Sequence, residues 1–443
     1  MRATLAMAVL CASPALAGEG YARLEGHGGP IKGVAVSSDG RHALTASFDN
    51  SVGFWSLGDG SSEPTWLEGH EAAANTVLFL PNSKRALSAG DDFAAFLWQT
   101  QDGKRVARLT GHQGKILDLA ATPDGTIAAS ASWDGKVGLW DLENGKLITM
   151  LKGHRAPVQA VRFARDGSQL YSASSDGTVR LWDVATHEIK RVEAKHGFGI
   201  NRLVINEPAG WLAYGALDGG VRILDLETGD EIADVTSGRQ PVLALTLSKD
   251  GSLMGIGDGE GYIHIVSTET WKTVRDFRAT ARGPVWALAF DGTERIVAGT
   301  IQDHADIWPI ATAKSVTENN AAPRDFLRDP ATMANGERQF ARKCSICHTL
   351  TEDGGRRAGP SLKGVFGRRA GTLPGYTYSD ALDGADLVWS DETLDKLFDL
   401  GPEHYTPGSK MPMQRIVRAE DRADLITYLK DVTGDAPVQE TKQ

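Results

Sequence analysis

Short apolar runs separated by Asp-Gly pairs fill most of the first three quarters of the chain. Segments such as VQAVRF (158–163) and LYSAS (170–174) alternate apolar with small or polar residues, the period-two pattern of a half-buried strand. Asp-Gly pairs between such runs favour tight hairpin turns, because glycine readily adopts left-handed backbone conformations. The pattern therefore predicts many short antiparallel strands over residues 20–310.

These strand segments repeat every 42 or 43 residues. SASWDGKVGLWD (130–141) and SASSDGTVRLWD (172–183) are near copies, and equal steps along the chain reach equivalent positions in both directions. The marker positions are Trp55, Trp98, Trp140, Trp182, Leu224, Val266 and Trp308. Four short strands in a repeat of this length make one blade of a β-propeller. The seven markers therefore predict seven blades.

Three repeats also share a polar set of His, Ser, Asp and Trp at fixed spacing. The sets are His27, Ser47, Asp49 and Trp55; His112, Ser132, Asp134 and Trp140; and His154, Ser174, Asp176 and Trp182. In the second repeat Gly90 stands where the serine is expected. Across residues 20–310 the repeats resemble the WD40 family, which implies a seven-bladed all-β propeller. The resemblance also implies that each set is a hydrogen-bonded structural tetrad rather than a metal or catalytic site.

The start of the propeller is predicted to close the ring. Tyr21-Ala22-Arg23-Leu24 matches segments that precede later Gly-His pairs, such as Val106-Ala107-Arg108-Leu109, and no Gly-His pair follows Trp308. We therefore expect the segment at 21–24 to be the outer strand of the seventh blade, where closure would protect the sheet edges.

Residues 1–17 have the pattern of a secretory signal peptide. Arg2 provides a positive start, Leu5 to Cys11 an apolar stretch, and Ala15-Leu16-Ala17 a cleavage site that leaves Gly18 as the mature N-terminus. The alternative, a membrane anchor, would need a longer apolar run to cross about 30 Å of hydrocarbon. We expect export to the periplasm and no integral membrane segment in the mature chain.

Composition and charge narrow the classes of function. The 443 residues include 50 Gly and three Cys and carry a formal charge of −10. So few cysteines cannot form a disulfide framework, and the negative charge argues against nucleic acid as a partner. Residues 18–329 contain 31 Lys and Arg against 40 Asp and Glu, while residues 330–443 contain 15 against 17. The acidity therefore lies mainly in the propeller.

The repeats end after Trp308, and the sequence beyond them no longer shows the strand pattern. Residues 18–311 are assigned to the propeller, and the polar segment 312–332, which contains Pro323 and Pro330, predicts a linker. Residues 333–434 form a predicted second domain, followed by a loose tail at 435–443.

The second domain contains Cys344-Ser345-Ile346-Cys347-His348, and C-x-x-C-H is the attachment site of c-type haem. On a helical turn Cys344 and Cys347 share one face, so both thiols can bond the two vinyl groups while His348 turns toward the iron. A thioredoxin-type redox pair would need a βαβ context that the sequence lacks. Half of a zinc site would need further ligands, and cleavage leaves no other cysteine. We expect one covalently attached haem c.

The segment from Gly336 to Leu429 resembles class I cytochrome c of the mitochondrial and bacterial c2 type. The matching stretches are GERQFARKCSICHT (336–349), GPSLKGVFGRRAGTLPGYTYSDAL (359–382), TPGSKMPM (406–413) and EDRADLITYLK (420–430). The resemblance implies an all-α domain with Met411 as the second axial ligand of the iron and Met413 as its rival. It also implies the remaining haem contacts. These are a Pro360 carbonyl that accepts from the His348 ring, and Arg368, Tyr378 and Trp389 as donors to the propionates.

One departure from the family concerns Leu397, which stands where many members have a tyrosine near the methionine. It affects the expected tuning of the potential and not the ligation.

Ligation by His348 and Met411 would leave no iron position for a substrate, which favours a carrier of single electrons. A cationic rim around the expected haem edge would dock acidic redox partners, or the chain's own acidic propeller. The rim residues are Lys343, Arg356, Arg357, Lys363, Lys410, Arg415 and Arg418. The propeller is expected to be a docking platform for partner proteins.

Two alternatives stay open. One is a redox enzyme, by fold-level analogy with cytochrome cd1 nitrite reductase, which joins a cytochrome c domain to an eight-bladed propeller. The other is a redox-sensing or assembly scaffold.

Overall fold

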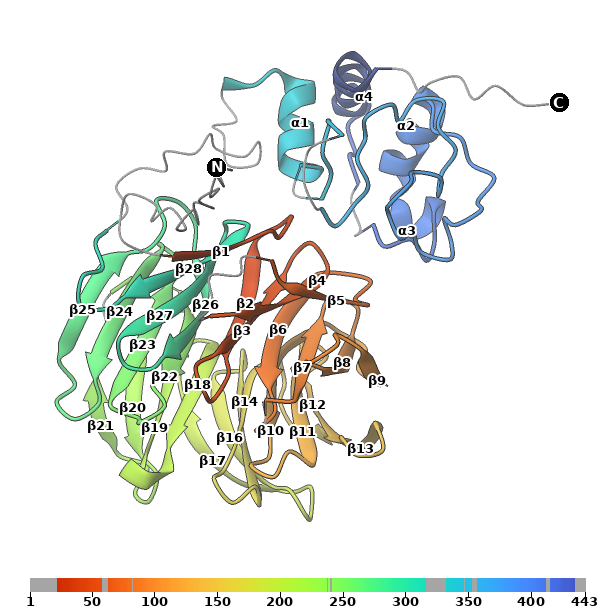
Figure 1. Ribbon diagram of the computed structural model, residues 1–443. Coiled ribbons are helices and arrows are strands. Elements are labelled where there is room, and N and C mark those ends of the chain that lie inside the picture. The colour runs from red at the N-terminus through yellow and green to blue at the C-terminus, as the bar shows by residue number, and fades with distance from the viewer. Residues whose placement is uncertain are drawn as a thin grey trace, which may run out of the picture.

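The computed structural model describes residues 22–57, 63–81, 83–236, 238–239, 241–315, 332–345, 347–352, 357–411 and 415–434. Within these residues, seven antiparallel sheets of four strands each precede a helical domain (Figure 1). The predicted arrangement of an all-β propeller followed by an all-α domain is confirmed. Residues 1–17, predicted to be a signal peptide, and residues 435–443, predicted to be a tail, lie outside the described residues.

Each of the first four blades is a continuous stretch of chain. Blade 1 consists of β2 (Ile31–Val36), β3 (His42–Ser47), β4 (Ser51–Ser56) and β5 (Thr65–Glu68). Blade 2 consists of β6 (Ala74–Phe79), β7 (Arg85–Gly90), β8 (Ala94–Gln99) and β9 (Arg105–Thr110). Blade 3 consists of β10 (Ile116–Ala121), β11 (Ile127–Ser132), β12 (Lys136–Asp141) and β13 (Lys146–Lys152). Blade 4 consists of β14 (Val158–Phe163), β15 (Gln169–Ser174), β16 (Thr178–Asp183) and β17 (Ile189–Lys195).

Blades 5 and 6 follow the same order although their sequences keep less of the repeat pattern, with His196 and Asp218 of blade 5 still bonded at 3.0 Å. Blade 5 consists of β18 (Ile200–Asn206), the short 3₁₀ helix η1 (Glu207–Ala209), β19 (Trp211–Ala216), β20 (Val221–Asp225) and β21 (Glu231–Asp234). Blade 6 consists of β22 (Val242–Leu247), β23 (Leu253–Asp258), β24 (Tyr262–Ser267) and β25 (Thr273–Arg278). Leu224 and Val266 are buried like the marker tryptophans, so apolar packing replaces the indole there.

Blade 7 joins the two ends of the propeller. Its strands are β26 (Val285–Asp291), β27 (Arg295–Thr300), β28 (His304–Pro309) and β1 (Ala22–Glu25). The N-terminal strand β1 pairs antiparallel with β28, with Arg23 opposite Asp306. The prediction that this segment supplies the outer strand of blade 7 is confirmed, since β1 lies at the edge of the sheet.

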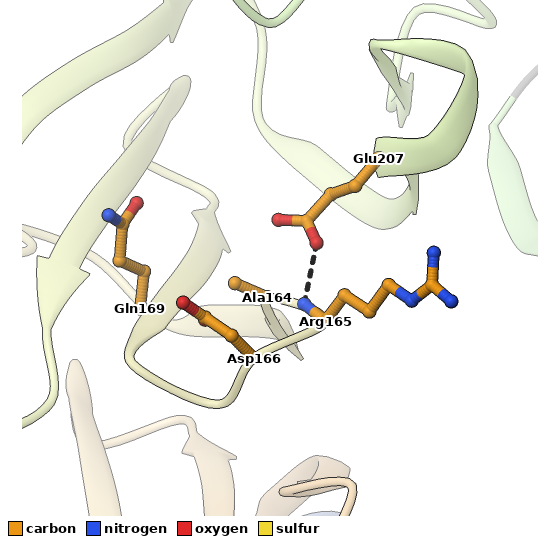
Figure 2. A pocket seen from close by; sticks show the side chains of 5 residues that line it. All are labelled: Ala164, Arg165, Asp166, Gln169 and Glu207. Atoms are coloured by element: carbon orange, nitrogen blue, oxygen red, sulfur yellow. Dashed lines mark hydrogen bonds between the residues drawn. The ribbon is translucent and has the colours of Figure 1, made fainter.

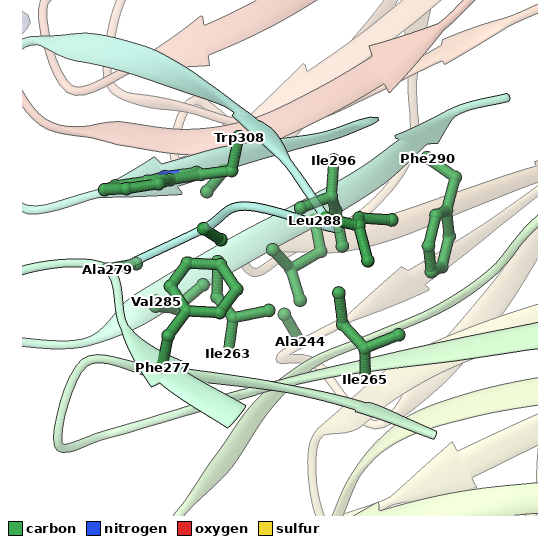
Figure 3. Close-up of a cluster of buried hydrophobic side chains, with 13 residues drawn as sticks. Ala244, Ile263, Ile265, Phe277, Ala279, Val285, Leu288, Phe290, Ile296 and Trp308 are labelled. Carbon is green, nitrogen blue, oxygen red and sulfur yellow. The ribbon is translucent and has the colours of Figure 1, made fainter. Parts of the chain in front are cut away.

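Apolar side chains between neighbouring blades form the core. Figure 3 shows one such cluster between blades 6 and 7, where Phe277 and Trp308 lie near Val285 and Ile296. The Phe277 and Trp308 rings are 5.2 Å apart. Burial of such large side chains is the main stabilising contribution, at about 25 cal/mol per Å² of apolar surface. The five marker tryptophans are each 1% exposed, which explains why this position carries the repeat signal.

The tetrads exist, but with a different hydroxyl from the one we expected. In blade 3, Ser130 lies 2.8 Å from His112 Nε2 and accepts from the Trp140 indole N–H at 2.8 Å. Ser132 instead donates to the Gly114 carbonyl. Likewise Thr45 replaces Ser47 in blade 1, and Ser172 replaces Ser174 in blade 4.

The strand pattern alone could not identify the hydroxyl of the tetrad. Residues two apart on a strand point to the same face, so the sequence does not distinguish the two hydroxyls. Blade 2 also has a complete tetrad, because Ser88 is hydrogen-bonded to both His70 and Trp98. Gly90 is therefore not a loss of the tetrad.

The helical domain consists of α1 (Asn335–Lys343), α2 (Asp391–Leu400), α3 (Pro402–Tyr405) and α4 (Ala419–Thr433). Helices α1 and α4 cross closely, and a Cβ on Gly336 would lie 2.1 Å from the Asp424 carbonyl oxygen. Phe340 packs on Tyr428 beside this crossing. None of the helices in the described residues is long and apolar enough to span a bilayer.

The first residues of the expected linker lie against the propeller. Ala313 is buried in the cluster between blades 6 and 7, and its carbonyl accepts from the Arg275 guanidinium. Ser315 accepts from the Arg278 backbone N–H. Residues 316–331 of the linker lie outside the described residues.

Candidate functional site

The two cysteines of the second domain lie on a turn that continues α1. The Cys344 N–H donates to the Phe340 carbonyl at 2.8 Å, and the N–H groups of Cys347 and His348 both donate to the Cys344 carbonyl. These hydrogen bonds have the i+3 and i+4 spacing of a helix, so the three side chains share one side of the turn. The geometry is the one that the spacing of the motif predicted.

Cys344 is buried in an apolar cluster, Cys347 is partly buried, and the two thiols are not joined as a disulfide. Burial raises the pKa of Cys344 to about 12 and that of Cys347 to about 11, with Arg357 opposing the rise at Cys347. A redox-active pair needs a lowered thiol pKa. The surroundings therefore disfavour the thioredoxin-type interpretation.

The imidazole of His348 is fixed from one side. Its Nδ1 lies 2.8 Å from the Pro360 carbonyl oxygen, so the ring donates its N–H there, as the family resemblance implied. Burial lowers the pKa of His348, which keeps the ring neutral. Among the described residues, no hydrogen bond engages Nε2. A neutral imidazole with a fixed tautomer and a free Nε2 is suited to bind a metal ion.

Gly359, which the sequence pattern did not single out, leaves the space that this ring occupies. A Cβ on Gly359 would lie 2.3 Å from His348 Cε1, and 2.7 and 2.8 Å from the two ring nitrogens. Any side chain here would displace the imidazole. The only sequence signal was the position of the glycine directly before Pro360.

Tyr376 was missed as well. Its hydroxyl donates to the Ala358 carbonyl at 2.5 Å, and burial raises its pKa to about 12, with Tyr378 and Cys347 adding to the rise. The phenol therefore lies near the cysteine turn. Its ring meets that of Tyr378 edge to face at 4.8 Å. Nothing in the spacing of the motif distinguished Tyr376 from Tyr378.

The remaining predicted residues surround the same core. Arg368 donates to the carbonyls of Ser361 and Lys363, and its backbone carbonyl accepts from the Trp389 N–H. Met411 packs partly buried against the apolar cluster that contains Cys344, and Trp389 packs there too. Leu397 is buried in the same cluster, so this departure from the family places an apolar group in the core. Met413 lies outside the described residues.

Comparison with known proteins agrees with this geometry. The family model "WD domain, G-beta repeat" matches residues 18–56, 61–99, 103–141 and 145–183, and the family model "Cytochrome c" matches residues 333–433. Cytochrome c of Sesamum indicum is 42% identical over 105 residues, which are 24% of this chain and 94% of the relative. Cytochrome c of Chlamydomonas reinhardtii is 43% identical over 110 residues, which are 25% of this chain and 97% of the relative. The chain belongs to the cytochrome c family.

The cytochrome domain is thus joined to a WD40 propeller, and the structure adds three blades beyond the four matched repeats. The residues present fit a covalent haem c. Two protonated thiols share one turn, a neutral imidazole offers Nε2, and a thioether lies at the edge of the same core. Cys344 and Cys347 would anchor the haem, and His348 would bind its iron.

One residue of the predicted rim reaches the propeller. The Arg357 guanidinium donates to the carbonyl of Gly28, in the loop between β1 and β2. The Gly28 N–H in turn donates to Asp49 of the blade 1 tetrad at 2.7 Å. Arg357 also affects the pKa of Cys347, so the haem-attachment turn of the cytochrome domain lies close to blade 1. Arg356 lies outside the described residues.

The propeller has surface pockets of its own, which are lined mainly by polar and charged residues rather than by cysteines. One lies between blades 4 and 5 and is lined by Ala164, Arg165, Asp166, Gln169 and Glu207 (Figure 2). There the Arg165 backbone N–H donates to the Glu207 carboxylate at 2.6 Å. In the described part of the chain, no three His, Cys, Asp or Glu side chains group in a way that could hold a metal ion.

Proposed function

We propose that this protein is a periplasmic monohaem cytochrome that carries single electrons, with its propeller as a docking platform for protein partners. The observation that carries the proposal is the His348 imidazole, fixed by Pro360 and open at Nε2, beside the two thiols of a single C-x-x-C-H motif. Haem c bound there takes up and releases one electron at a time.

The protein supplies the surroundings for this chemistry. The Pro360 bond orients His348, and an apolar cluster around Cys344 keeps water away from the site. His348 and Met411 would together hold the haem iron and would leave no coordination position for a substrate. A soft thioether favours ferrous iron and raises the reduction potential.

The docking role of the propeller rests on its shape and on its contact with the cytochrome domain. A closed ring of seven sheets offers a rigid face, and the contact between Arg357 and the Gly28 loop brings the haem-attachment turn to that ring. A partner that binds the propeller near blade 1 would therefore lie close to the haem.

The test is the spectrum and the haem content of the full-length exported protein. We expect one haem per chain, a low-spin reduced spectrum, and loss of the low-spin state in Met411→Ala but not in Met413→Ala. A high-spin spectrum of the wild-type protein would contradict the carrier. A second chromophore or metal at one per chain would favour a redox enzyme.

Export and partner choice need separate measurements. We expect the processed protein, beginning at Gly18, in the periplasmic fraction. Affinity capture from that fraction should return the same redox partner under oxidising and reducing conditions. Capture in only one redox state would instead support a sensing scaffold.

A further inference from the structure

The axis of the propeller carries positive charge although the propeller as a whole is acidic. The seven innermost strands are β2, β6, β10, β14, β18, β22 and β26, each packed on the next, with β26 packed on β2. Their charged residues are Lys32, Asp118, Arg162, Arg202 and Asp291. Asp291 ends β26 and is paired with Arg295. Three cations and one carboxylate therefore remain along the rest of this ring.

Lys32 lies at the start of the innermost strand of blade 1, where the pairing register of β2 with β3 shifts. A residue at such a bulge is left out of the ladder and can point away from it. Its ammonium lies 5.4 Å from the ring centres of both Phe48 and Trp286, which come from blades 1 and 7. The aromatic pair holds the lysine in position without neutralising it.

Arg202 enters from blade 5. Its guanidinium donates to the Asn201 carbonyl at 2.9 Å, and in the part of the chain that the structure describes no carboxylate forms an ion pair with it. Arg162 of blade 4 is different, because it is paired with Asp118 at 2.5 Å. We call Lys32, Arg162 and Arg202 the axial cations.

These groups act on one another electrostatically. Burial lowers the pKa of Lys32, Asp91 opposes this, and Arg202 and Lys115 lower it further. Burial lowers the pKa of Arg202 as well, and Arg162 adds to that effect while Asp118 opposes it. Lys32, Arg162 and Arg202 are all half-buried. Like charges held near one another in such positions are unfavourable unless an opposite charge compensates them. The carboxylates near these cations already have partners: Asp118 is paired with Arg162, Asp291 with Arg295, and Asp91 with Lys115.

We propose that the axis of the propeller binds a small dianionic oxyanion, of the phosphate, sulfate or dicarboxylate class, through Arg202 and Lys32 with Arg162 beside them. Arginine provides paired donors for such oxygens, and lysine adds a point charge. The site is separate from the haem and does not depend on the proposed electron-carrier function. A bound anion would tie blades 1, 4 and 5 together across the ring.

The test uses the full-length holoprotein and three probes: inorganic phosphate, sulfate and succinate. Each probe is titrated at constant ionic strength while thermal unfolding of the β-structure is followed. We expect a saturable rise in the unfolding temperature, because a ligand that binds only the folded state stabilises it. A response to phosphate and sulfate alone would indicate a tetrahedral anion, and a response to succinate alone a dicarboxylate.

Variants separate a built site from general charge effects. Arg202→Met and Lys32→Met should each weaken binding by at least about tenfold, because each removes a charged hydrogen-bond donor. Arg191→Met is the matched control, since Arg191 lies on the outer strand β17 with half its side chain exposed. If Arg202→Met does not fold, Arg202→Lys and Lys32→Met still test the site.

Two results would overturn the proposal. One is the absence of a saturable effect with all three probes. The other is an equal loss of affinity in Arg191→Met and Arg202→Met, which would show an adventitious ion only.

Discussion

Both parts of the molecule bury histidines whose Nδ1 is hydrogen-bonded, but they use the second ring nitrogen differently. In the propeller, His112 binds Asp134 through Nδ1 at 2.9 Å and Ser130 through Nε2 at 2.8 Å. In the cytochrome domain, His348 binds Pro360 through Nδ1, and its Nε2 has no hydrogen bond among the described residues. A fully bonded imidazole is a structural element, whereas a half-bonded one is available as a ligand.

The largest expected effect comes from removing the half-bonded ring. His348→Ala should abolish the low-spin haem spectrum, because the imidazole is the group placed to bind the iron. The measurement is the haem-to-protein ratio and the reduced absorption spectrum of the purified protein. His112→Ala is the matched control and should leave both unchanged. A normal spectrum in His348→Ala would contradict the assignment.

The next largest effect is expected from Gly359, which leaves space for the imidazole of His348. Gly359→Ala should shift or lose the low-spin spectrum, because the new methyl group would overlap the imidazole of His348. Overpacking of this kind costs about 1–3 kcal/mol in folding free energy or more. Gly197→Ala is a suitable control, since a Cβ there meets nothing within 4 Å. Equal behaviour of the two variants would argue against a positioning role for Gly359.

A smaller effect tests the corrected tetrad. Ser130→Ala should lower the free energy of unfolding of the propeller by about 1–3 kcal/mol, because it leaves buried groups of His112 and Trp140 without a partner. Ser132→Ala, two residues along β11, should leave the contacts of both rings intact. Denaturant unfolding followed by circular dichroism compares the two. A tryptophan environment altered only in Ser132→Ala would restore the original assignment.

The smallest expected effect is the loss of folding stability at low pH. Burial lowers the pKa of His154 below its usual 6.5, so the unfolded chain takes up a proton first and stability falls as the pH drops below about 6.5. Hydrogen bonds to Thr178, Arg155 and His154 outweigh burial and lower the pKa of Asp176 to about 2. Its contribution, at most about 2 kcal/mol, is present above pH 4 and is lost toward pH 2.

Unfolding titrations at several pH values should show both steps in the wild-type protein. Asp176→Asn should make the lower step smaller without removing it, because the pKa values of Asp49, Asp92 and Asp134 are lowered as well. An unchanged lower step in this variant would contradict the contribution of Asp176. The haem content should stay constant through the upper step.

The fold was largely accessible from the sequence because the signal was periodic. Trp98 and Trp140 mark equivalent buried positions, and equal steps reach Leu224 and Val266, where the indole is absent but the burial remains. The pairing of β1 with β28 also followed from a matching segment. The tetrad hydroxyl did not, since Ser130 and Ser132 lie on the same face of one strand and only their contacts differ.

The residues of the candidate site could be predicted from the sequence where the chemistry of the site fixes their spacing. They could not be predicted where their role depends on how distant segments pack together. Cys344, Cys347 and His348 must follow one another closely to share a turn, so the motif shows them. The contact of Gly359 with the imidazole depends on how two loops approach each other, which no local pattern contains. The axial cations were hidden for a similar reason. Lys32 and Arg202 come from blades 1 and 5, and only closure of the ring brings them together.

The seam between β1 and β28 has a consequence for how the chain is made. Arg23 and Asp306, bonded at 3.2 Å across that seam, are 283 residues apart. During synthesis from the N-terminus, β1 therefore stays unpaired until β28, the last strand of the propeller, has been synthesised. Cys344 and Cys347 follow later still, so every strand of the ring exists before the haem can be attached. A chain cut after β28 keeps both halves of the seam, whereas one cut before β28 leaves β1 with nothing to pair with.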